Sequence, residues 1–471
     1  MLLCWCIAAI IFCHLDPGTL QGHLKREKYY RSIMVERIAD SSLAFPARFA
    51  QCEQYEVSKG ELWCSILSGS ADIRKLALLL PEESAMNIIV CGKDVSKNTV
   101  RNNVPVHFLV YSDSSYCEYA VRFTTLPVFF LETERAADDL DQPCLLNGLP
   151  GEIHIRGASG RGREKQSFKI RMEKKVSFLD MRKDDDWVLN AVYNDPERIR
   201  NVFSSNLWYK SCCGNNGFSV RNGYEYRYVE LFLNGSYHGL YALGYKPDRK
   251  QFDLKDDEYL FSKINYLNNE YGYKLHGKSL ETPGEAWAAL QTDYAEDDDS
   301  SIDMWLFVLL CNAQDNSEKN YYLALKKNGS GYEAIYSPWD LDLTWGNTWS
   351  EDGINEVAEY AVDYESIVSF FPCEAHYRIL SGDSETLSRA MGRYRELRQN
   401  AWSDKELLRQ LDGYEEQIYG SGAYRRDISR WPDSNVQDPE NGLSVFRKYV
   451  LARTKWLDKN LEKTVLSYCE E

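Results

Sequence analysis

Two carboxylates in the second half of the chain have a spacing suited to metal binding. Asp340 and Asp342 follow a strand-like run at 332–336. If the backbone stays extended there, alternation directs both side chains to the same face. Hard divalent cations prefer oxygen ligands, so the two carboxylates could approach one ion. If the chain turns instead, only one of them would be a direct ligand. The structural alternative is an Asp-rich turn beside two tryptophans.

A second pair of oxygen-bearing side chains, Asp315 and Asn320, follows the apolar run 302–314, which is a helix candidate. Their D-x4-N spacing is that of the protein kinase catalytic loop. There the carboxylate accepts the proton of the acceptor hydroxyl, and the amide oxygen binds a metal. The same spacing is frequent by chance, so it identifies no active site when it stands alone.

A glycine-rich basic segment, residues 153–171, could hold phosphate groups. Three glycines and Ser159 form a loop after a strand, and Lys165 and Lys169 lie in the basic strand that follows. Backbone N–H groups of such a loop can approach phosphate oxygens, and an ammonium group can neutralise them. The segment matches neither common phosphate-loop pattern. A basic hairpin without ligand is therefore the alternative.

The order of these segments along the chain connects them. The glycine-rich loop is followed by a hairpin signal at Asn234-Gly235, then by the D-x4-N pair, and then by the two carboxylates. Phosphoryl-transfer sites of kinase-like folds have this linear order. The reaction needs cations for the phosphates, oxygen ligands for Mg²⁺ and one carboxylate near the attacking hydroxyl. The chain offers all three.

Five blocks in this region resemble the spore coat protein H (CotH) kinase family, whose members are atypical protein-kinase-like enzymes. The blocks, in chain order, are Arg156-Gly-Ala-Ser159 with Lys165-Gln-Ser-Phe-Lys-Ile-Arg171, Trp187-Val-Leu with Asp195 and Arg200-Asn201, Glu230 to Tyr241, Asp315 to Leu323, and Pro338-Trp-Asp-Leu-Asp342.

The resemblance implies an enzyme that depends on ATP and on Mg²⁺ or Mn²⁺. It would transfer the γ-phosphate to Ser or Thr of surface or spore-coat-type proteins. By matching positions, Asp315 would orient or deprotonate the acceptor hydroxyl. Asn320 and Asp340, together with Asp342, would hold the metal.

Nucleotide binding is implied for the first block. Lys165 or Lys169 would contact the α- and β-phosphates, and the match does not choose between them. Arg156 and Ser159 belong to the same nucleotide-binding block. Arg200-Asn201, in the second block, is expected to be a structural helix contact, although an arginine there could reach a phosphate.

One departure from the family pattern concerns activity. The family usually continues after Gly-Leu-Tyr with a Glu-containing segment, whereas this chain has Tyr245. If that Glu positions the lysine or contacts nucleotide, its loss favours a catalytically weak, pseudokinase-like structural or assembly protein of the cell surface or spore coat. The presence of Asp315, Asn320 and Asp340 favours catalysis. A carbohydrate-active enzyme with two acids and aromatic platforms is a third, less supported hypothesis.

The elements that must position these residues are of mixed type. Short apolar runs cut by polar turns predict a small antiparallel β-domain before residue 150. Strand and helix patterns mix as far as residue 370, and the chain beyond is helical and charged. We expect an α+β fold, with an N-terminal small β-rich domain followed by an atypical protein-kinase-like domain and a helical C-terminal tail. The expected bounds are 1–23 for a leader, 24–145 for a linker helix and the β-rich domain, and 146–471 for the kinase-like domain, with its core at 150–370 and its tail at 374–471.

The composition limits the classes of molecule that the protein could bind. The 471 residues include 55 Lys+Arg and 71 Asp+Glu, a formal charge of −16. This balance argues against nucleic acid as the main partner, because neutralising phosphates needs clustered Lys and Arg. We expect a protein substrate with Ser or Thr acceptors.

The apolar run 2–13 has the length of a signal segment and is too short to span a bilayer. No other stretch is long and apolar enough to do so, so we expect no integral membrane domain. A secreted, cell-surface or spore-coat location is expected, with a cytoplasmic one as the alternative. In an exported chain, cysteines between 52 and 117 could form one or two disulfides.

Overall fold

The computed structural model describes part of the chain in full and a further part as backbone strands only. Strand backbones are described between residues 48 and 123 and at 355–357, and the fully described residues are, apart from a few side chains, 124–157, 162–267, 270–281, 283–291, 294–349 and 371–469. The expected leader, the linker helix and Ser159 lie outside the described residues, and so do the side chains of the cysteines between 52 and 117. The cysteines that are described carry free thiols, at Cys144, Cys212, Cys213, Cys311 and Cys373.

The N-terminal region contains a five-stranded sheet, in agreement with its pattern of short apolar runs. The strands, in sheet order, are β2 (Gln54–Ser58), β3 (Glu61–Ser65), β7 (Tyr116–Thr124), β6 (Val106–Tyr111) and β5 (Asn87–Cys91). The pairing of β3 with β7 is parallel, whereas the other pairs are antiparallel. The sheet is therefore mixed, and the prediction of a purely antiparallel domain was wrong for this pair. Two short strands, β1 (Arg48–Phe49) and β4 (Leu78–Leu79), pair separately.

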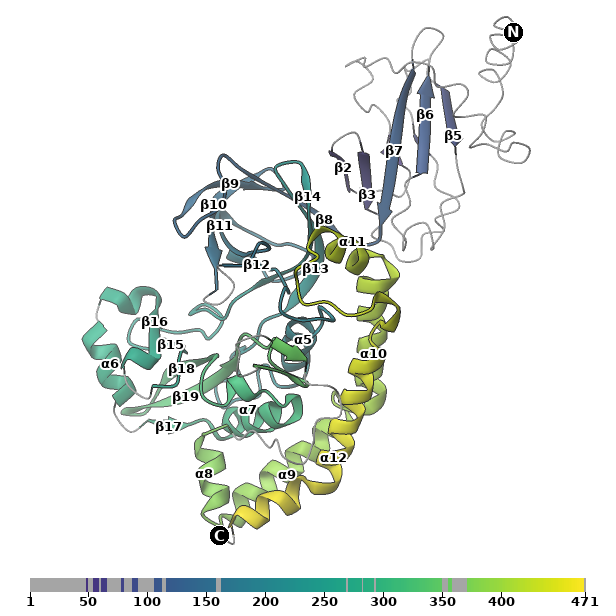
Figure 1. Ribbon diagram of the computed structural model, residues 1–471. Helices are drawn as coiled ribbons and strands as arrows, with labels where there is room; N and C mark the ends of the chain where they lie inside the picture. The colour runs from purple at the N-terminus through teal and green to yellow at the C-terminus, as the bar shows by residue number, and fades with distance from the viewer. Residues whose placement is uncertain are drawn as a thin grey trace, which may run out of the picture.

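Seven strands close into a barrel (Figure 1). In barrel order they are β10 (Leu149–Arg156), β11 (Ser167–Val176), β12 (Asp184–Asn190), β14 (Ser236–Tyr245), β13 (Tyr226–Leu233), β8 (Val128–Thr133) and β9 (Gln142–Leu146). β8 and all but the last residue of β9 precede the 145/146 boundary expected from the sequence, yet they pair with β13 and β10. The barrel therefore extends across that boundary, because closure requires these two strands.

Buried side chains alternate with more exposed ones along β10 and β11, as in barrel strands whose alternate residues face the interior. Ile153, Ile170, Trp187 and Leu243 are fully buried in one hydrophobic cluster. The hairpin predicted at Asn234-Gly235 is confirmed, since β13 and β14 pair antiparallel up to this turn. Both turn residues have positive φ, of 49° and 70°, as a two-residue turn of this kind requires.

A second five-stranded sheet follows the barrel in the chain. Its strands, in sheet order, are β16 (Tyr273–His276), β15 (Tyr259–Lys263), β18 (Tyr321–Asn328), β19 (Gly331–Pro338) and β17 (Ala295–Glu296). The predicted apolar helix is α7 (Asp298–Cys311), and every residue from Ser300 to Cys311 is buried. It is capped by the Asp297 side chain, which accepts from the Ser300 N–H, and it ends at Asn312 in the left-handed conformation. α7 thus delivers the chain to the segment that contains Asp315.

The predicted helical tail is confirmed by five helices (Figure 1). They are α8 (Glu374–Leu380), α9 (Ser384–Gln399), α10 (Asp404–Glu415), α11 (Ala423–Arg430) and α12 (Ser444–Cys469). In Figure 1, α10 and α12 run along one side of the molecule, while α11 lies beside the barrel strands β13 and β14. The observed architecture is α+β. Over the described residues, no helix combines the length and apolar character needed to cross a bilayer.

Candidate active site

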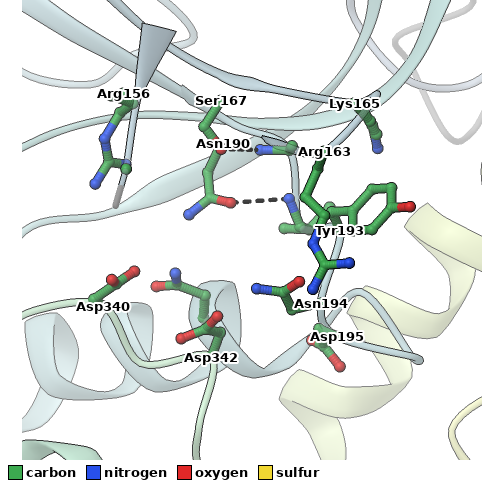
Figure 2. Close-up of a pocket in the computed structure, with 14 residues that line it drawn as sticks. Arg156, Arg163, Lys165, Ser167, Asn190, Tyr193, Asn194, Asp195, Asp340 and Asp342 are labelled. Atoms are coloured by element: carbon green, nitrogen blue, oxygen red, sulfur yellow. Dashed lines mark hydrogen bonds between the residues drawn. The ribbon is translucent and has the colours of Figure 1, made fainter. Parts of the chain in front are cut away.

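A pocket collects residues from five separate segments of the chain. Its wall includes the end of β10, the segment before β11, the end of β12 with the loop 191–195, the start of helix α5 (Arg200–Ser211), and the turn after β19. Figure 2 shows basic side chains, among them Arg156 and Arg163, on one side of the pocket. Asp340 and Asp342 lie on the opposite side. The pocket therefore places cations and carboxylates across a common space.

Asp340 and Asp342 both line this pocket, although the chain turns between them. Asp340 has a φ of +56°, so the backbone is not extended, and the alternation argument for a shared face does not apply. The turn brings both carboxylates to the pocket by another route. Burial raises the pKa of Asp340, partly offset by the nearby Arg156 charge. Burial and the charge of Asp340 raise the pKa of Asp342 well above its usual range.

Asn320 lies beside Asp340 at one end of the β18–β19 pair. Tyr321 pairs with Pro338, and one step further the Trp339 N–H donates to the Asn320 carbonyl at 2.9 Å. Asn320 also has a positive φ, of 58°. Left-handed conformations of residues other than glycine tend to cluster at functional sites. The structure therefore brings these two predicted metal ligands, 20 residues apart in sequence, to the same end of one strand pair.

Asp315 is held within the loop that precedes β18. Its carboxylate accepts from the Asn320 amide at 2.5 Å and from the Tyr266 hydroxyl at 3.1 Å, and it lies 2.9 Å from the Lys319 ammonium. Asn316 ties this loop to the end of β19, donating from Nδ2 to the carbonyls of Asn320 and Trp339, each at 2.7 Å. Asp315 and Asn320 are not among the residues that line the pocket. They lie next to it, and the charge of Asp315 contributes to the raised pKa of both Asp340 and Asp342.

The structure separates the two lysines that the sequence left as alternatives. Lys165 lines the pocket, and its fully buried ammonium donates to Asp427 Oδ1 and to the Leu240 carbonyl, each at 2.6 Å. Burial lowers the pKa of Lys165 to about 8. Lys169 is not among the lining residues, and its ammonium lies 3.3 Å from Asp186 Oδ1. Of the two lysines, Lys165 is therefore the one that lines this pocket.

Arg156 also lines the pocket. Its guanidinium lies over the ring of Trp339, 5.2 Å from the ring centroid. Trp339 directly precedes Asp340 in the chain. A planar guanidinium fixed in this way can contact a phosphate group through two donors.

Sequence reasoning missed Asn201, the second residue of α5. Its side chain is 3% exposed and lines the pocket with Asp340 and Asp342, and its Oδ1 has no hydrogen-bond partner in the structure. The neighbouring Arg200 does make the structural contacts expected for the pair. Its guanidinium donates to Asp195 Oδ1 at 2.5 Å and to the Thr344 carbonyl at 3.0 Å. The signal available in the sequence was the position of Asn201 inside a family block.

The donor set suits a hard divalent cation. Among the described residues, no group of three or more His, Cys, Asp or Glu is arranged to hold a metal ion. Mg²⁺ is usually bound through one or two carboxylates, with substrate phosphates and water completing the shell. Two carboxylates with raised pKa values, beside amide oxygens, match this requirement because a cation relieves their mutual repulsion.

A pocket with cationic side chains on one side and two carboxylates on the other, beside a loop with D-x4-N spacing, is the arrangement of a kinase-like protein. The family model described as CotH kinase protein matches residues 153–298 and 296–457. The matched residues make up more than half of the chain, so the chain belongs to the CotH kinase protein family.

Two further comparisons concern a solved structure and the curated protein sequences. A crystal structure of the Helicobacter pylori proinflammatory kinase CtkA is similar at 11% sequence identity and a TM-score of 0.24, covering 64% of this chain and 94% of that chain. No curated protein sequence matches the chain significantly.

Proposed function

We propose that this protein transfers the γ-phosphate of ATP to a Ser or Thr hydroxyl of a protein, in a reaction that depends on Mg²⁺ or Mn²⁺. The pocket supports this proposal because it sets Asp340 and Asp342 opposite Arg156 and Lys165. Phosphoryl transfer is promoted chiefly by positioning and by charge. It therefore needs cationic groups and metal-binding carboxylates on opposite sides of the phosphates. The family match is a second observation that supports a kinase.

In this proposal, Asp340 and Asp342 hold the cation together with Asn320. The cation would neutralise charge on the phosphates as the transfer proceeds. Arg156 and Lys165 bind phosphate oxygens from the opposite side. A buried ammonium group needs a counter-charge, and Asp427 supplies it for Lys165. Asp427 thereby stabilises the ammonium form that phosphate binding requires.

Asp315 orients the acceptor hydroxyl and accepts its proton. Its carboxylate is held at one oxygen by Lys319 and Tyr266 and at the other by Asn320. These contacts fix the direction in which the carboxylate points. The Lys319 ammonium also places a positive charge beside this carboxylate.

The acceptor proteins that we propose are surface or spore-coat-type proteins. The membership of the chain in the CotH kinase protein family supports this class of acceptor. A secreted, cell-surface or spore-coat location goes with it, since enzyme and acceptor must meet.

Transfer of radiolabel from [γ-³²P]ATP tests the proposal, with Mg²⁺ or Mn²⁺ and a Ser/Thr-containing protein acceptor. Asp340→Asn should abolish metal-dependent nucleotide binding, because a metal ligand loses its charge. Asp315→Asn should keep nucleotide binding and lower turnover at least 100-fold, because proton transfer contributes about 10²–10⁴-fold.

Asp412→Asn serves as the control, since Asp412 is an exposed carboxylate paired with Arg447. It should label like the wild type. Equal labelling in all four proteins would show that the label does not come from this site. Metal-dependent nucleotide binding without any transfer would instead favour the pseudokinase-like alternative.

A further inference from the structure

Among the described residues, Asn201 is one of four buried asparagines whose amide oxygen has no hydrogen-bond partner, and of the four it is the one that lines the pocket. Its side chain is 3% exposed, yet its Oδ1 has no hydrogen-bond partner. Asn206, on the same helix, shows the normal arrangement. Its Oδ1 accepts from the Tyr226 N–H at 2.9 Å, and its Nδ2 donates to the Tyr226 carbonyl at 3.1 Å and the Tyr414 hydroxyl at 2.7 Å. Buried polar atoms in native proteins are almost always paired, so an unpaired one needs an explanation.

The open oxygen of Asn201 lies in the pocket that contains both carboxylates. Asn201, Asp340 and Asp342 all line it. An amide oxygen that has no protein partner, in a pocket with two carboxylates, is a donor available to a ligand. Because the two carboxylates favour a positive charge, a cation is the ligand that all three oxygens would accept together.

The start of α5 is fixed to the turn that carries Asp342. Arg200 donates from Nε to the Thr344 carbonyl at 3.0 Å, and Ser204 Oγ lies 3.3 Å from Thr344 Oγ1. The Trp345 indole N–H donates to Ser204 Oγ at 2.9 Å. Asn201 lies between Arg200 and Ser204 on the helix. Its position relative to the carboxylates is therefore set by contacts on both sides of it.

We propose that Asn201 is an oxygen ligand of the divalent cation held by Asp340 and Asp342. This assignment rests on the proposed function, because it places the cation in the same pocket. A neutral ligand suits this position. Asp195 is already close enough to add to the negative charge around Asp342, and a third ligating carboxylate would increase that repulsion.

In ordinary protein kinases, a helix contributes a glutamate that pairs with the phosphate-binding lysine. The α5 sequence contains no acidic residue. Here the lysine partner is Asp427 on α11, and α5 contributes to the cation site instead.

Mn²⁺ binding, followed by electron paramagnetic resonance on the full chain with and without ATP, tests the assignment without depending on activity. Asn201→Ala should weaken Mn²⁺ binding about tenfold or more, by the scale at which metal-site residues act. Asn201→Asp should bind Mn²⁺ more tightly than Asn201→Ala, because a carboxylate also ligates. Asn206→Ala is the matched control on the same helix, and its folded fraction should bind Mn²⁺ normally. Circular dichroism on each variant establishes that it is folded.

The outcomes separate this inference from the proposed function. Normal Mn²⁺ binding by Asn201→Ala, with binding lost in Asp340→Asn, would overturn the role of Asn201 and leave the proposed function standing. Normal binding by both variants would remove the cation from this pocket and overturn both. Weaker binding by Asn201→Asp than by Asn201→Ala would also overturn the assignment, since it would mean that the amide serves a phosphate as a hydrogen-bond donor.

Discussion

Tyr245 shows what a single departure from the family pattern does in this fold. Its ring is buried in the barrel, with the Arg182 guanidinium 4.2 Å from the ring centroid and Trp187 packed edge-on. It does not line the pocket. The lysine that the missing glutamate was thought to position has Asp427 as its partner instead. Tyr245 is therefore a packing residue, and its presence does not weaken the case for catalysis.

We expect Tyr245→Phe to keep phosphate transfer and nucleotide affinity within about twofold of the wild type, because the ring stays in place. The free energy of unfolding should fall by about 1 kcal/mol, because the variant loses the side-chain hydrogen bond between Tyr245 and Tyr209. Transfer kinetics and urea denaturation would measure the two effects. A tenfold loss of nucleotide affinity would mean that Tyr245 contacts the nucleotide after all.

His238 is a second single residue with a measurable effect, because it makes the free energy of unfolding depend on pH. Its ring stacks on Tyr241 and contacts Trp431, and burial together with the Lys165 charge lowers its pKa to about 3. In the unfolded chain, histidine binds a proton below about pH 6.5. Between these two values the unfolded state binds more protons. Stability is therefore lost as the pH falls from 6.5 toward 3.

Urea denaturation between pH 7 and pH 4 should detect this dependence. The wild type should lose up to about 1.4 kcal/mol per pH unit more than His238→Phe over this range. His276, whose pKa is also lowered to about 3, remains in both proteins and contributes equally. If the free energy of unfolding changed with pH in the same way in both proteins, His238 would have to be accessible to protons in the folded state.

At the scale of elements, α11 completes the wall that contains Lys165. Asp427 accepts from Lys165 at 2.6 Å and from Arg198 at 3.0 Å, and all three side chains are buried. Gly239 on β14 allows this approach. It has a φ of +123°, and a Cβ there would come within 2.6 Å of Asp427 Oδ1. The C-terminal tail is thus part of the site's architecture, since it supplies the counter-charge for a pocket residue.

Asp427→Asn should destabilise the protein by about 3–5 kcal/mol, because it leaves two buried cations without their carboxylate. Asp412→Asn should cost at most about 1 kcal/mol, because its pair with Arg447 is exposed. Thermal and urea denaturation of both variants measure the difference. Similar losses would mean that water reaches Lys165 and Arg198 in the folded protein.

At the scale of the whole molecule, the barrel joins residues that the sequence assigned to different domains. β8 pairs in parallel with β13, and β9 pairs with β10. Thr124, just ahead of β8, is buried and donates to Glu230 on β13, which also pairs with Arg426 on α11. The barrel and the helical tail are therefore held together by contacts that begin near residue 124.

A chain that begins at Thr124 should fold and keep metal-dependent nucleotide binding, because it retains all seven barrel strands. A chain that begins at Leu146 should not fold cooperatively, because it lacks β8 and nearly all of β9 and leaves β13 and β10 with unpaired edges. Circular dichroism and thermal denaturation compare the two chains. Cooperative unfolding of the shorter chain would place the domain boundary where the sequence suggested.

Much of the local structure was predictable because its causes are local. The Asn234-Gly235 turn, the apolar run of α7 and the helical tail depend on residues close together in the chain. The order of the motif blocks also carried the family resemblance, and the family match confirms it. Asp340 and Asn320 were recognisable as candidate ligands because their residue types and spacing were sufficient.

Long-range contacts were decided only by the tertiary structure. Lys165 and Asp427 are 262 residues apart, so no sequence window contains both. Asn201 was interpreted as a structural contact because its open oxygen becomes visible only when the carboxylates stand beside it. The pairing of β8 with β13 likewise depends on barrel closure. Residue type and spacing specify which groups are available for chemistry, whereas burial and pairing between distant segments determine which of them meet and what charge they carry.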